Sequence, residues 1–357
     1  MKKIDWYIVK KFLGTFFFAI LILAVIACVI DLAEKMDDFV SKKAPVSAIL
    51  NYYKDFVPHI SALLFPLFIF IATIFFTSKM AYQSEVITIL ASGVSFQRFL
   101  KPYVIGATFL GVLSLITNHW IVPNANKQRL AFEDRYVHNV TQSTNGGVHL
   151  RLSKDLFVYM REYRFVDNYG QSFSAEKIEG TLLKEKLVAD HISYDSIKKT
   201  WHLYNVIVRT NNDIHETIRF LNDTIIKYPF APGDMKINDD SKDAMTTPEL
   251  ITYIDRETLR GRENLNIYMV EKHRRTAQPV AGFILTIIGV CIAHKKIRGG
   301  SGLHLALGIV ICALFEMLMQ FSTTFSTKAG LNPFIAAWIP NLVFGYVAYY
   351  LYRRQIK

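Results

Sequence analysis

The sequence predicts a membrane protein with six transmembrane α-helices, three before and three after an inserted all-β domain of the sandwich or jelly-roll type. Two features support this fold class: apolar residues gather in six long runs, and short strand-like segments fill the middle of the chain. A helix needs about 20 mostly apolar residues to cross the ~30 Å hydrocarbon core of a bilayer. The six runs that meet this requirement are residues 12–30, 56–78, 102–122, 276–294, 303–321 and 329–352.

The positive charges indicate how these helices are oriented. The chain has a net charge of +11, and this excess lies on one side of an alternating topology, where 13 basic residues accompany two acidic ones in residues 1–11, 79–101, 295–298 and 353–357. Bases and acids nearly balance elsewhere, with 23 and 22 in residues 124–275. Basic residues favour cytoplasmic loops. We therefore predict cytoplasmic termini and an external middle segment, and we do not interpret the charge as a nucleic-acid surface.

The first apolar run has an alternative interpretation as a signal peptide, because Cys28 ends a weak lipoprotein-type cleavage sequence. The run is longer than the apolar region of a signal peptide and continues past Cys28, which favours a transmembrane helix. The three cysteines, Cys28, Cys291 and Cys312, all fall in apolar runs. We therefore predict no disulfide in the external domain, although that side of the membrane is oxidising.

The middle segment contains short stretches rich in β-branched and aromatic residues, separated by turn signals, as expected of strands. These stretches are residues 156–165, 171–178, 186–194, 201–210, 215–221 and 224–230. Large apolar side chains occupy both alternating sets of residues 201–210. This pattern predicts a strand that is covered on both faces, either by a sandwich core and a packed neighbour or by a lumen that accepts acyl chains.

A helical connector is predicted between the strands and the last three membrane helices. Thr247, Pro248 and Glu249 have the pattern of an N-cap, a first helical residue and a first-turn acid. A second helix, from about Leu265, carries three basic residues that we expect to reach lipid phosphates: Lys272, Arg274 and Arg275. The predicted domains are then residues 1–123 with the first three helices, 124–246 with the β-domain, 247–275 with the connector and 276–357 with the last three helices.

The sequence contains none of the common patterns of an energy-converting or hydrolytic enzyme. A GxxxxGK[ST] phosphate loop, an HExxH pair and a GxSxG turn are all absent from it. Few polar side chains lie in the apolar runs, which argues against a membrane-embedded hydrolase. We therefore predict a noncatalytic subunit with no metal and no cofactor of its own, whose work depends on another subunit.

The cytoplasmic segment after the second run has an amphipathic pattern. A helix over about residues 80–93, ending at Gly93, would place its apolar residues on one face: Met80, Val86, Ile87, Leu90 and Val94. Such a helix either lies on the lipid surface or docks into a cytoplasmic ATPase, with the Glu85 carboxylate offered to a basic residue. The pattern alone favours neither interpretation.

The same segment resembles a known family. QSEVI at residues 83–87 and ASG at residues 91–93 are similar to the signature of the LptF/LptG permeases of lipopolysaccharide export. IDWYIVK at residues 4–10 is similar to the LDRYI-type start of LptG, and residues 265–279 and Asn332-Pro333 also look like that family. The resemblance covers nearly the whole chain in order, and its start favours LptG over LptF.

The resemblance implies a multi-pass protein of the bacterial inner membrane, with a periplasmic middle domain of the β-jelly-roll type. It implies several partners: a homologous permease subunit in a heterodimer, a cytoplasmic ATPase that binds the ATP, a single-span periplasmic β-jelly-roll protein, and a periplasmic bridge protein that receives lipopolysaccharide. The ATPase would contact Ser84, Glu85 and Val86. The alternatives are a permease for another lipid or for lipoproteins, and a membrane-anchored sensor, which would need a cytoplasmic output domain.

Substrate contacts are expected at two places. The family places basic residues at the outer end of the first helix, against lipid A phosphates, and the resemblance implies this role for Lys35, Lys42 and Lys43. The sequence departs from the family here, because acids are interspersed among these lysines: Asp31, Glu34, Asp37 and Asp38. The resemblance also implies a lateral opening between the first helix of one subunit and the fifth helix of its partner.

Glu316 and Gln320 are the second expected contact. They lie four residues apart and therefore on one face of the fifth predicted helix. An ionisable group inside a membrane span is costly unless it faces protein or water. We expect the pair either to line the substrate cavity or to form hydrogen bonds between helices.

Overall fold

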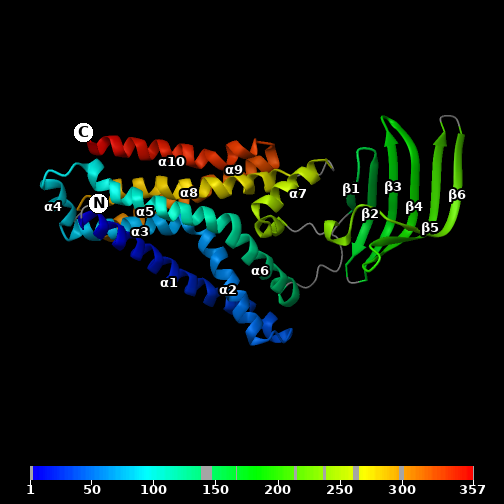
Figure 1. Ribbon diagram of the computed structural model, residues 1–357, viewed down its shortest axis with the longest axis horizontal. Helices are drawn as coiled ribbons and strands as arrows, with labels where there is room; N and C mark the ends of the chain where they lie inside the picture. The colour runs from blue at the N-terminus through cyan, green and yellow to red at the C-terminus, as the bar shows by residue number, and fades with distance from the viewer. Residues whose placement is uncertain are drawn as a thin grey trace. The chain divides into compact units, whose positions relative to one another are not determined.

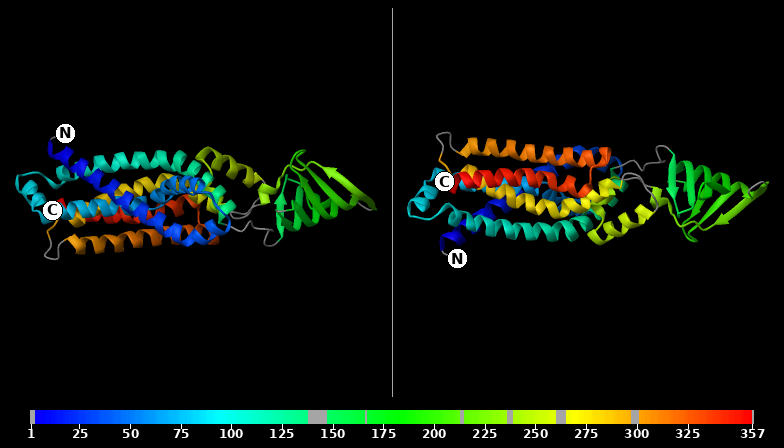
Figure 2. Two further views of the ribbon diagram at one scale, coloured as in Figure 1. Left: turned by 90° about the horizontal axis from the view of Figure 1, so that it is seen from below. Right: turned by 90° about the horizontal axis from the view of Figure 1, so that it is seen from above.

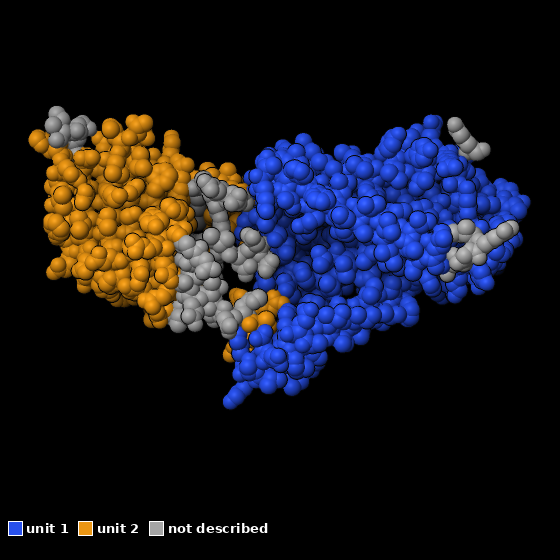
Figure 3. All heavy atoms as spheres, turned by 180° about the vertical axis from the view of Figure 1, so that it is seen from behind, with its two compact units in different colours: residues 1–132, 242–250, 266–357 blue, residues 133–241, 251–265 orange. Residues whose placement is uncertain are grey.

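The computed structural model describes residues 3–137, 147–165, 167–212, 215–235, 239–259, 265–296 and 301–356. The chain divides into two compact units, one of residues 1–132, 242–250 and 266–357 and the other of residues 133–241 and 251–265 (Figure 3). Within the described residues, six helices are long and apolar enough to cross a membrane: Lys3–Ser41, Phe65–Tyr82, Phe96–Tyr136, Asn266–Ala293, Gly302–Ala329 and Pro333–Ile356. The predicted six-helix membrane fold is confirmed.

The helices follow one another in the order shown in Figure 1. They are α1 (Lys3–Ser41), α2 (Val46–Leu63), α3 (Phe65–Tyr82), α4 (Glu85–Ala91), α5 (Phe96–Ile116), the π-helix η1 (Thr117–Ile121), α6 (Val122–Tyr136), the 3-10 helices η2 (Pro232–Met235) and η3 (Asp239–Ala244), α7 (Thr247–Leu259), α8 (Asn266–Ala293), α9 (Ser301–Ala329) and α10 (Pro333–Ile356). Both chain ends lie at the same end of the helical bundle. The three cysteines are free thiols on α1, α8 and α9.

The second predicted span is interrupted in the structure. Its window, residues 56–78, is divided between α2 and α3, which meet at Leu64 (φ −96°, ψ 9°). Pro66 lies in the first turn of α3, where a missing backbone N–H is tolerated. The carbonyl of Ala62, four residues before Pro66, instead accepts a hydrogen bond from Gln278 Nε2 at 2.5 Å. A side chain of α8 thus replaces the backbone donor that proline removes, as a break at membrane depth requires.

α8 is the central helix of the bundle and packs against α3, α5, α9 and α10 (Figure 2). Small residues let it approach α3 closely. A Cβ atom added at Gly289 would lie 2.9 Å from Thr73 Cγ2, and one added at Gly282 would lie 2.8 Å from Phe65 Cε1. Close packing of small residues holds helices together in lipid, where the hydrophobic effect does not drive them together.

α1 is packed at its two ends and exposed between them. Asp5, Ile8 and Phe12 are buried near its start, and Asp31 and Phe39 near its end. Between residues 17 and 30, all of which the structure describes, Ala24 is the one buried residue, and Ile20 and Leu23 are partly buried. The other large apolar side chains are exposed: Phe17, Phe18, Leu21, Ile22, Val25, Ile26, Val29 and Ile30. This surface of α1 is open to lipid, substrate or another chain.

The described strands of the second unit form one six-stranded antiparallel sheet (Figure 1). They are β1 (Val148–Arg151), β2 (Leu156–Arg164), β3 (Tyr169–Glu179), β4 (Leu182–Asp195), β5 (Thr200–Asn212) and β6 (His215–Ile226). Neighbours in the sheet follow the chain order. The inserted β-domain is confirmed, and its described strands form a meander without the crossover of a Greek-key jelly roll.

A line of irregular residues crosses this sheet. Ser172 on β3 and Asn205 on β5 have positive φ angles, 51° and 53°, and the strand ladder skips both of them together with Asp190 of β4. Asn adopts the left-handed conformation more readily than most residues, and Asn205 Nδ2 donates a hydrogen bond to Asp190 Oδ2 at 2.9 Å. Each such residue shifts the alternation of buried and exposed side chains by one position.

This shift corrects the interpretation of residues 201–210. Trp201, Leu203 and Val206 all belong to a single buried cluster, although the first two fall in one alternating set and Val206 in the other. Trp201 Nε1 donates a hydrogen bond to the carbonyl of Phe230 at 3.0 Å within that cluster. Before Asn205 one alternating set of β5 faces the core, and after Asn205 the other set faces the same core. Neither cover on both faces nor a lumen is needed to explain the apolar residues in both sets.

Candidate functional site

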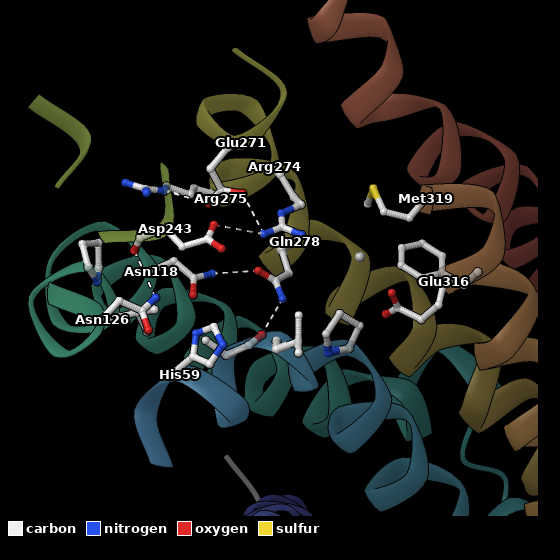
Figure 4. A pocket seen from close by; sticks show the side chains of 17 residues that line it. His59, Asn118, Asn126, Asp243, Glu271, Arg274, Arg275, Gln278, Glu316 and Met319 are labelled. Carbon is white, nitrogen blue, oxygen red and sulfur yellow. Dashed lines mark hydrogen bonds and ion pairs between the residues drawn. The ribbon is translucent and has the colours of Figure 1, made fainter. Parts of the chain in front are cut away.

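A polar pocket lies in the helical unit (Figure 4). Two of the helices that line it, α2 and α6, lie at the end of the bundle away from the chain termini (Figure 1). Its volume is about 90 Å³, and it is lined by residues of α2, α3, η1, α6, η3, α8 and α9. Charged and amide side chains line one part of it, and Phe315, Met319 and Pro66 line another. The lining is therefore mixed, with a charged and amide part and an apolar part.

Four charged residues form a compact ion cluster beside the pocket. Arg275 is only 3% exposed, and its Nε lies 3.1 Å from Glu271 Oε1. Arg274 Nη2 lies 2.7 Å from Glu271 Oε2 and 3.8 Å from Asp243 Oδ1. Arg275 also donates hydrogen bonds to Thr247 Oγ1 and to the carbonyl of Lys242, at 3.2 and 3.0 Å. The cluster thus fixes the start of α8 against the chain segment of η3 and α7.

The cluster overturns the expectation that these arginines extend to lipid phosphates. The guanidinium groups of Arg274 and Arg275 point into the protein, where carboxylates and a carbonyl bind them. Lys272 is half-buried on the same turn of α8. The reason is the carboxylate of Glu271, which lies one turn before Arg275 on the same helix face and which the sequence interpretation did not use.

Asp243 is the least satisfied member of the cluster. Within the described part of the chain, no group donates a hydrogen bond to its buried Oδ1 atom. Burial, and then the neighbouring charge of Glu271, raise the pKa of Asp243 to about 6, while Arg274 opposes this rise. A buried carboxylate oxygen that accepts no hydrogen bond is costly, so at neutral pH this residue destabilises the end of the bundle that holds the pocket.

A chain of amide side chains connects the pocket to the break between α2 and α3. Asn118 Nδ2 donates to Gln278 Oε1 at 3.1 Å, and Gln278 Nε2 donates to the carbonyl of Ala62 (Figure 4). Asn118 lies in the π-helix η1, whose wider turn separates α5 from α6. Short π-helices are frequent at functional sites. The adjacent His119 ring lies 2.7 Å from Thr247 Oγ1.

Glu316 and Gln320, the second expected substrate contact, both lie on α9. Glu316 is exposed on α9 and lines the pocket opposite Arg274 (Figure 4). Gln320 is also exposed, one turn further along α9. Around them α9 presents apolar side chains to the outside: Leu303, Leu307, Ile309, Val310, Leu314, Met317, Phe321 and Phe325. α9 therefore carries an open face, as α1 does.

The three lysines expected to bind phosphates are not equivalent. Lys35 lies 2.7 Å from Asp31 Oδ1 and donates a hydrogen bond to Tyr52 Oη at 2.5 Å. Tyr52 and Tyr53 donate hydrogen bonds to the same Asp31 carboxylate. Lys35 thus belongs to a network that fastens α1 to α2. Lys42, half-buried, and Lys43, exposed at a φ of 52°, lie in the turn that follows α1.

The residues expected to contact an ATPase lie at the other end of the bundle. The helix expected over residues 80–93 is divided, because Ser84 has a left-handed conformation (φ 64°) between α3 and α4. Ser84 Oγ accepts a hydrogen bond from Lys296 Nζ at 3.1 Å. Glu85 is half-buried, and its Oε2 atom lies 3.5 Å from Tyr7 Oη.

Val86 has an internal position. It is fully buried in the cluster that also contains Ile8 and Phe12 of α1. The exposed residues of α4 are instead Ile87, Thr88 and Ala91. A docking partner would therefore touch this second face and the Glu85 carboxylate, while Val86 anchors α4 to the bundle.

One structural detail of the connector differs from its prediction. The N-cap of α7 is Thr246, one residue before the expected Thr247. The carbonyl of Thr246 accepts a hydrogen bond from the Leu250 N–H at 2.8 Å, and its own N–H donates to Glu249 Oε2 at 2.8 Å. The contact between the Thr246 N–H and the Glu249 side chain is one half of a capping box. Lys127 Nζ, 2.7 Å from Glu249 Oε1, together with the Thr246 N–H lowers the pKa of Glu249 to about 2.

The fold and these surfaces define a multi-pass membrane protein of the permease type, with two open helix faces and a separate β-domain. A comparison with protein families identifies which one. The family described as lipopolysaccharide export system permease LptF/LptG matches residues 6–354, and the chain belongs to this family. No curated protein matches the sequence. The predicted family is confirmed, and the chain is a permease-type subunit of the inner membrane.

Proposed function

We propose that the chain is the noncatalytic permease subunit of an ATP-driven lipopolysaccharide exporter. It pairs with a homologous permease, couples to a cytoplasmic ATPase that binds the ATP, and passes lipopolysaccharide to a periplasmic bridge of β-domains. The observation that carries this proposal is the family match over residues 6–354. The LptG-like start, residues 4–10, favours LptG as the particular subunit.

The test is reconstitution of the chain with a homologous permease and an ATPase in proteoliposomes. Lipopolysaccharide should stimulate ATP turnover and leave the membrane, and a lipoprotein of the same acyl-chain content should do neither. Stimulation by the lipoprotein alone would assign the chain to lipoprotein release. The absence of any lipid-dependent turnover in the wild-type complex would refute the proposal.

The charge distribution supports an orientation with cytoplasmic termini. Both chain ends lie at the end of the bundle that also carries α4, and the segments there hold the excess of basic residues. The β-domain is then periplasmic. Protease added to the outside of spheroplasts should cleave within residues 124–275 and spare the termini; the reverse pattern would overturn this orientation.

A lateral opening for the lipid is proposed between α1 of one subunit and α9 of its partner. In the most apolar 18-residue stretch of each helix, 11% of the residues of α1 and 28% of those of α9 are buried inside the protein, compared with 72% of those of α3. Two helices that leave most of their apolar surface uncovered suit an interface that must open and close. Glu316, and Gln320 beside it, would face the lipid-filled cavity. Exchanging Glu316 for Gln should leave assembly intact and impair lipid loading, measured by photocrosslinking to lipopolysaccharide.

Phosphate binding is proposed for the lysines at the outer end of α1, and we expect Lys42 and Lys43 to contribute more than Lys35. Lys42 and Lys43 lie in the turn, whereas Lys35 is bound to Asp31 and would contribute after that network rearranges. The Lys42→Gln/Lys43→Gln variant should lower lipid-stimulated turnover, and Lys35→Gln should also lower thermal stability. A triple Gln variant with unaltered lipid-stimulated turnover would remove this role.

Coupling to the ATPase is proposed through α4. Glu85 offers a carboxylate to a basic residue of the partner, Ser84 sets the direction of the helix, and Val86 anchors it. Glu85→Lys should abolish co-purification with the ATPase. Glu34→Lys, the same charge reversal at an exposed site on the outer half of α1, should not. Equal recovery of the ATPase with both variants would exclude docking at Glu85.

The last strand of the sheet supports a link to the bridge. Among the described strands β6 lies at an edge of the sheet, and four of its apolar residues are exposed: Ile218, Phe220, Leu221 and Ile225. An uncovered edge can pair with a strand of another β-domain. A photoreactive residue at Phe220 should crosslink to the periplasmic β-jelly-roll protein, and one at Ile197, which is 93% exposed in the turn before β5, should not.

A further inference from the structure

We propose that Asp5 and Arg98 form a positioning ion pair that fastens the cytoplasmic end of α1 to the start of α5, so that displacement of α4 is transmitted to α1. The transmission rests on the proposed docking of an ATPase at α4. The pair gives a role to the opening residues 4–10, which supported the family resemblance but which the proposed function leaves without a task.

The two residues meet although they lie 93 positions apart. Arg98 Nη2 lies 2.6 Å from Asp5 Oδ2, and the Asp5 side chain is only 9% exposed, against 35% for Arg98. A carboxylate removed from water to this extent needs a charged partner. The contact is therefore a determinant of where the first turn of α1 lies.

The position of Arg98 within its own helix also indicates a tertiary role. It lies in the first turn of α5, where Ser95 Oγ accepts a hydrogen bond from the Arg98 N–H at 3.3 Å. A positive charge at a helix N-terminus is unfavourable because of the helix dipole. The sequence thus places arginine where it weakens α5 locally and where it reaches Asp5.

Neighbouring residues of α1 contact α4 as well. Tyr7 Oη lies 3.5 Å from Glu85 Oε2, and Ile8 is buried in the same cluster as Val86. One turn of α1 therefore contacts α4 through Tyr7 and Ile8 and contacts α5 through Asp5. The helices α4 and α5 flank the turn at residues 92–95. Movement of α4 relative to α1 requires that these contacts break or that α1 follows.

The rest of α1 is suited to follow. Phe12 packs closely on α5, since a Cβ atom added at Gly106 would lie 2.7 Å from Phe12 Cδ1. Beyond Phe16 the helix has its exposed stretch, and its outer end is bound to Tyr52 of α2, a helix that the break at Leu64 separates from α3. A push at Asp5 can then move α1 and α2 about that break, which changes the proposed lateral opening.

The link itself can be tested in the full-length chain alone, without an ATPase. Spin labels are placed at Lys10→Cys on α1 and Ile87→Cys on α4, both exposed, in a background in which the three native cysteines are alanine. Double electron–electron resonance should give a narrow distance distribution for the unmodified pair and a broad one for Arg98→Gln. The charge swap Asp5→Arg/Arg98→Asp should restore the narrow distribution. An unchanged distribution in Arg98→Gln would overturn the proposal.

Transmission is tested in the assembled complex by the number of lipid molecules extracted per ATP hydrolysed. This ratio should fall at least about fivefold in Arg98→Gln, the lower range of coupling between sites, while ATPase binding is retained. The swap should restore it. Lys101→Gln, which removes a charge from an exposed residue of the same helix, should leave it unchanged.

An ion pair that only stabilises the fold would lower the amount of folded complex without altering the number of lipid molecules extracted per ATP. An unchanged number in Arg98→Gln would therefore refute the proposal that the pair transmits movement from α4 to α1. Failure of the proposed function has a different signature, namely no lipid-dependent turnover in the wild-type complex. The distance measurement still decides the link in that event.

Discussion

Exchange of Asp243 for Asn should stabilise the protein at neutral pH, which is the opposite of what removing a member of an ion cluster usually does. Burial is the main cause that raises the pKa of Asp243, and the negative charge of Glu271 raises it further. The positive charges of Arg274, Lys242 and Arg275 lower it. The result is a pKa of about 6 in the folded protein, above the usual value of 3.8. Proton binding at Asp243 therefore favours the folded state.

The sign and size follow from proton linkage. Between pH 3.8 and 6 the folded state holds a proton on Asp243 that the unfolded state has lost, so stability falls as the pH rises through this window. A difference of about two pH units corresponds to about 3 kcal/mol at 1.36 kcal/mol per unit. Asp243→Asn removes this cost, and the gain should be close to zero near pH 4 and approach its full size above pH 6.

Thermal unfolding in detergent at several pH values measures this effect. A gain of about 3 kcal/mol corresponds to a rise of about 6 °C at about 2 °C per kcal/mol. Asp37→Asn, at an exposed acid of α1, is the matched control and should change little at any pH. A lower unfolding temperature for Asp243→Asn at pH 7.5, or a difference from wild type that does not vary between pH 4 and 7, would refute the reasoning.

Three further variants probe other parts of the structure. Gly289→Val should cost about 1–3 kcal/mol by overpacking against Thr73, whereas Gly14→Val, where no atom lies within 4 Å of the added Cβ, should not lower the unfolding temperature comparably. Tyr52→Phe removes a hydrogen bond to the buried Asp31 carboxylate, and we expect a loss of about 1–3 kcal/mol in the same assay. Glu249→Gln should cost less than about 1 kcal/mol of stability, because the ion pair with Lys127 is half exposed. The pKa of Glu249 is lowered to about 2, so the stabilisation is present above the usual pKa of 4.5 and is lost as the pH falls toward 2. The unfolding temperatures of the variant and the wild type should therefore converge at low pH.

The membrane helices and the inserted β-domain could be predicted because their signals are local and repeated. A long apolar run in a bilayer satisfies its backbone hydrogen bonds by forming a helix. The predicted stretches correspond to five strands, β2 through β6, with the last two stretches, 215–221 and 224–230, falling on the single strand β6, and β1 was missed. The break at Leu64 had a local signal too, Pro66, which the length of the apolar run concealed. The pattern of residues 201–210 was read correctly as unusual, but its cause, the left-handed Asn205, has only a weak sequence signal.

The ion cluster of the pocket could not be predicted from the sequence. Glu271 and Arg275 have helical spacing, but Asp243 lies about thirty residues earlier in a polar segment, and only the folded chain brings it to Arg274. The same holds for Asp31, whose partner Lys35 is local while Tyr52 is not. The family resemblance suggested a phosphate ligand at Lys35 and charge suggested one at Arg274, because a sequence does not show which charges are already neutralised.

Polar contacts hold both ends of α1 and the break before α3 in place, and this has a mechanical consequence. The network of Asp31 joins α1 to α2, the pair of Asp5 and Arg98 joins α1 to α5, and Gln278 joins α8 to the break at Ala62. Each contact is polar and specific, whereas the middle of α1 has little packing to hold it. Because polar contacts of this kind are lost or retained as a whole, while apolar surfaces slide, movement of α1 should occur as a rigid rotation about its bound ends, and the residues between 17 and 30 should then carry the largest change in exposure during transport.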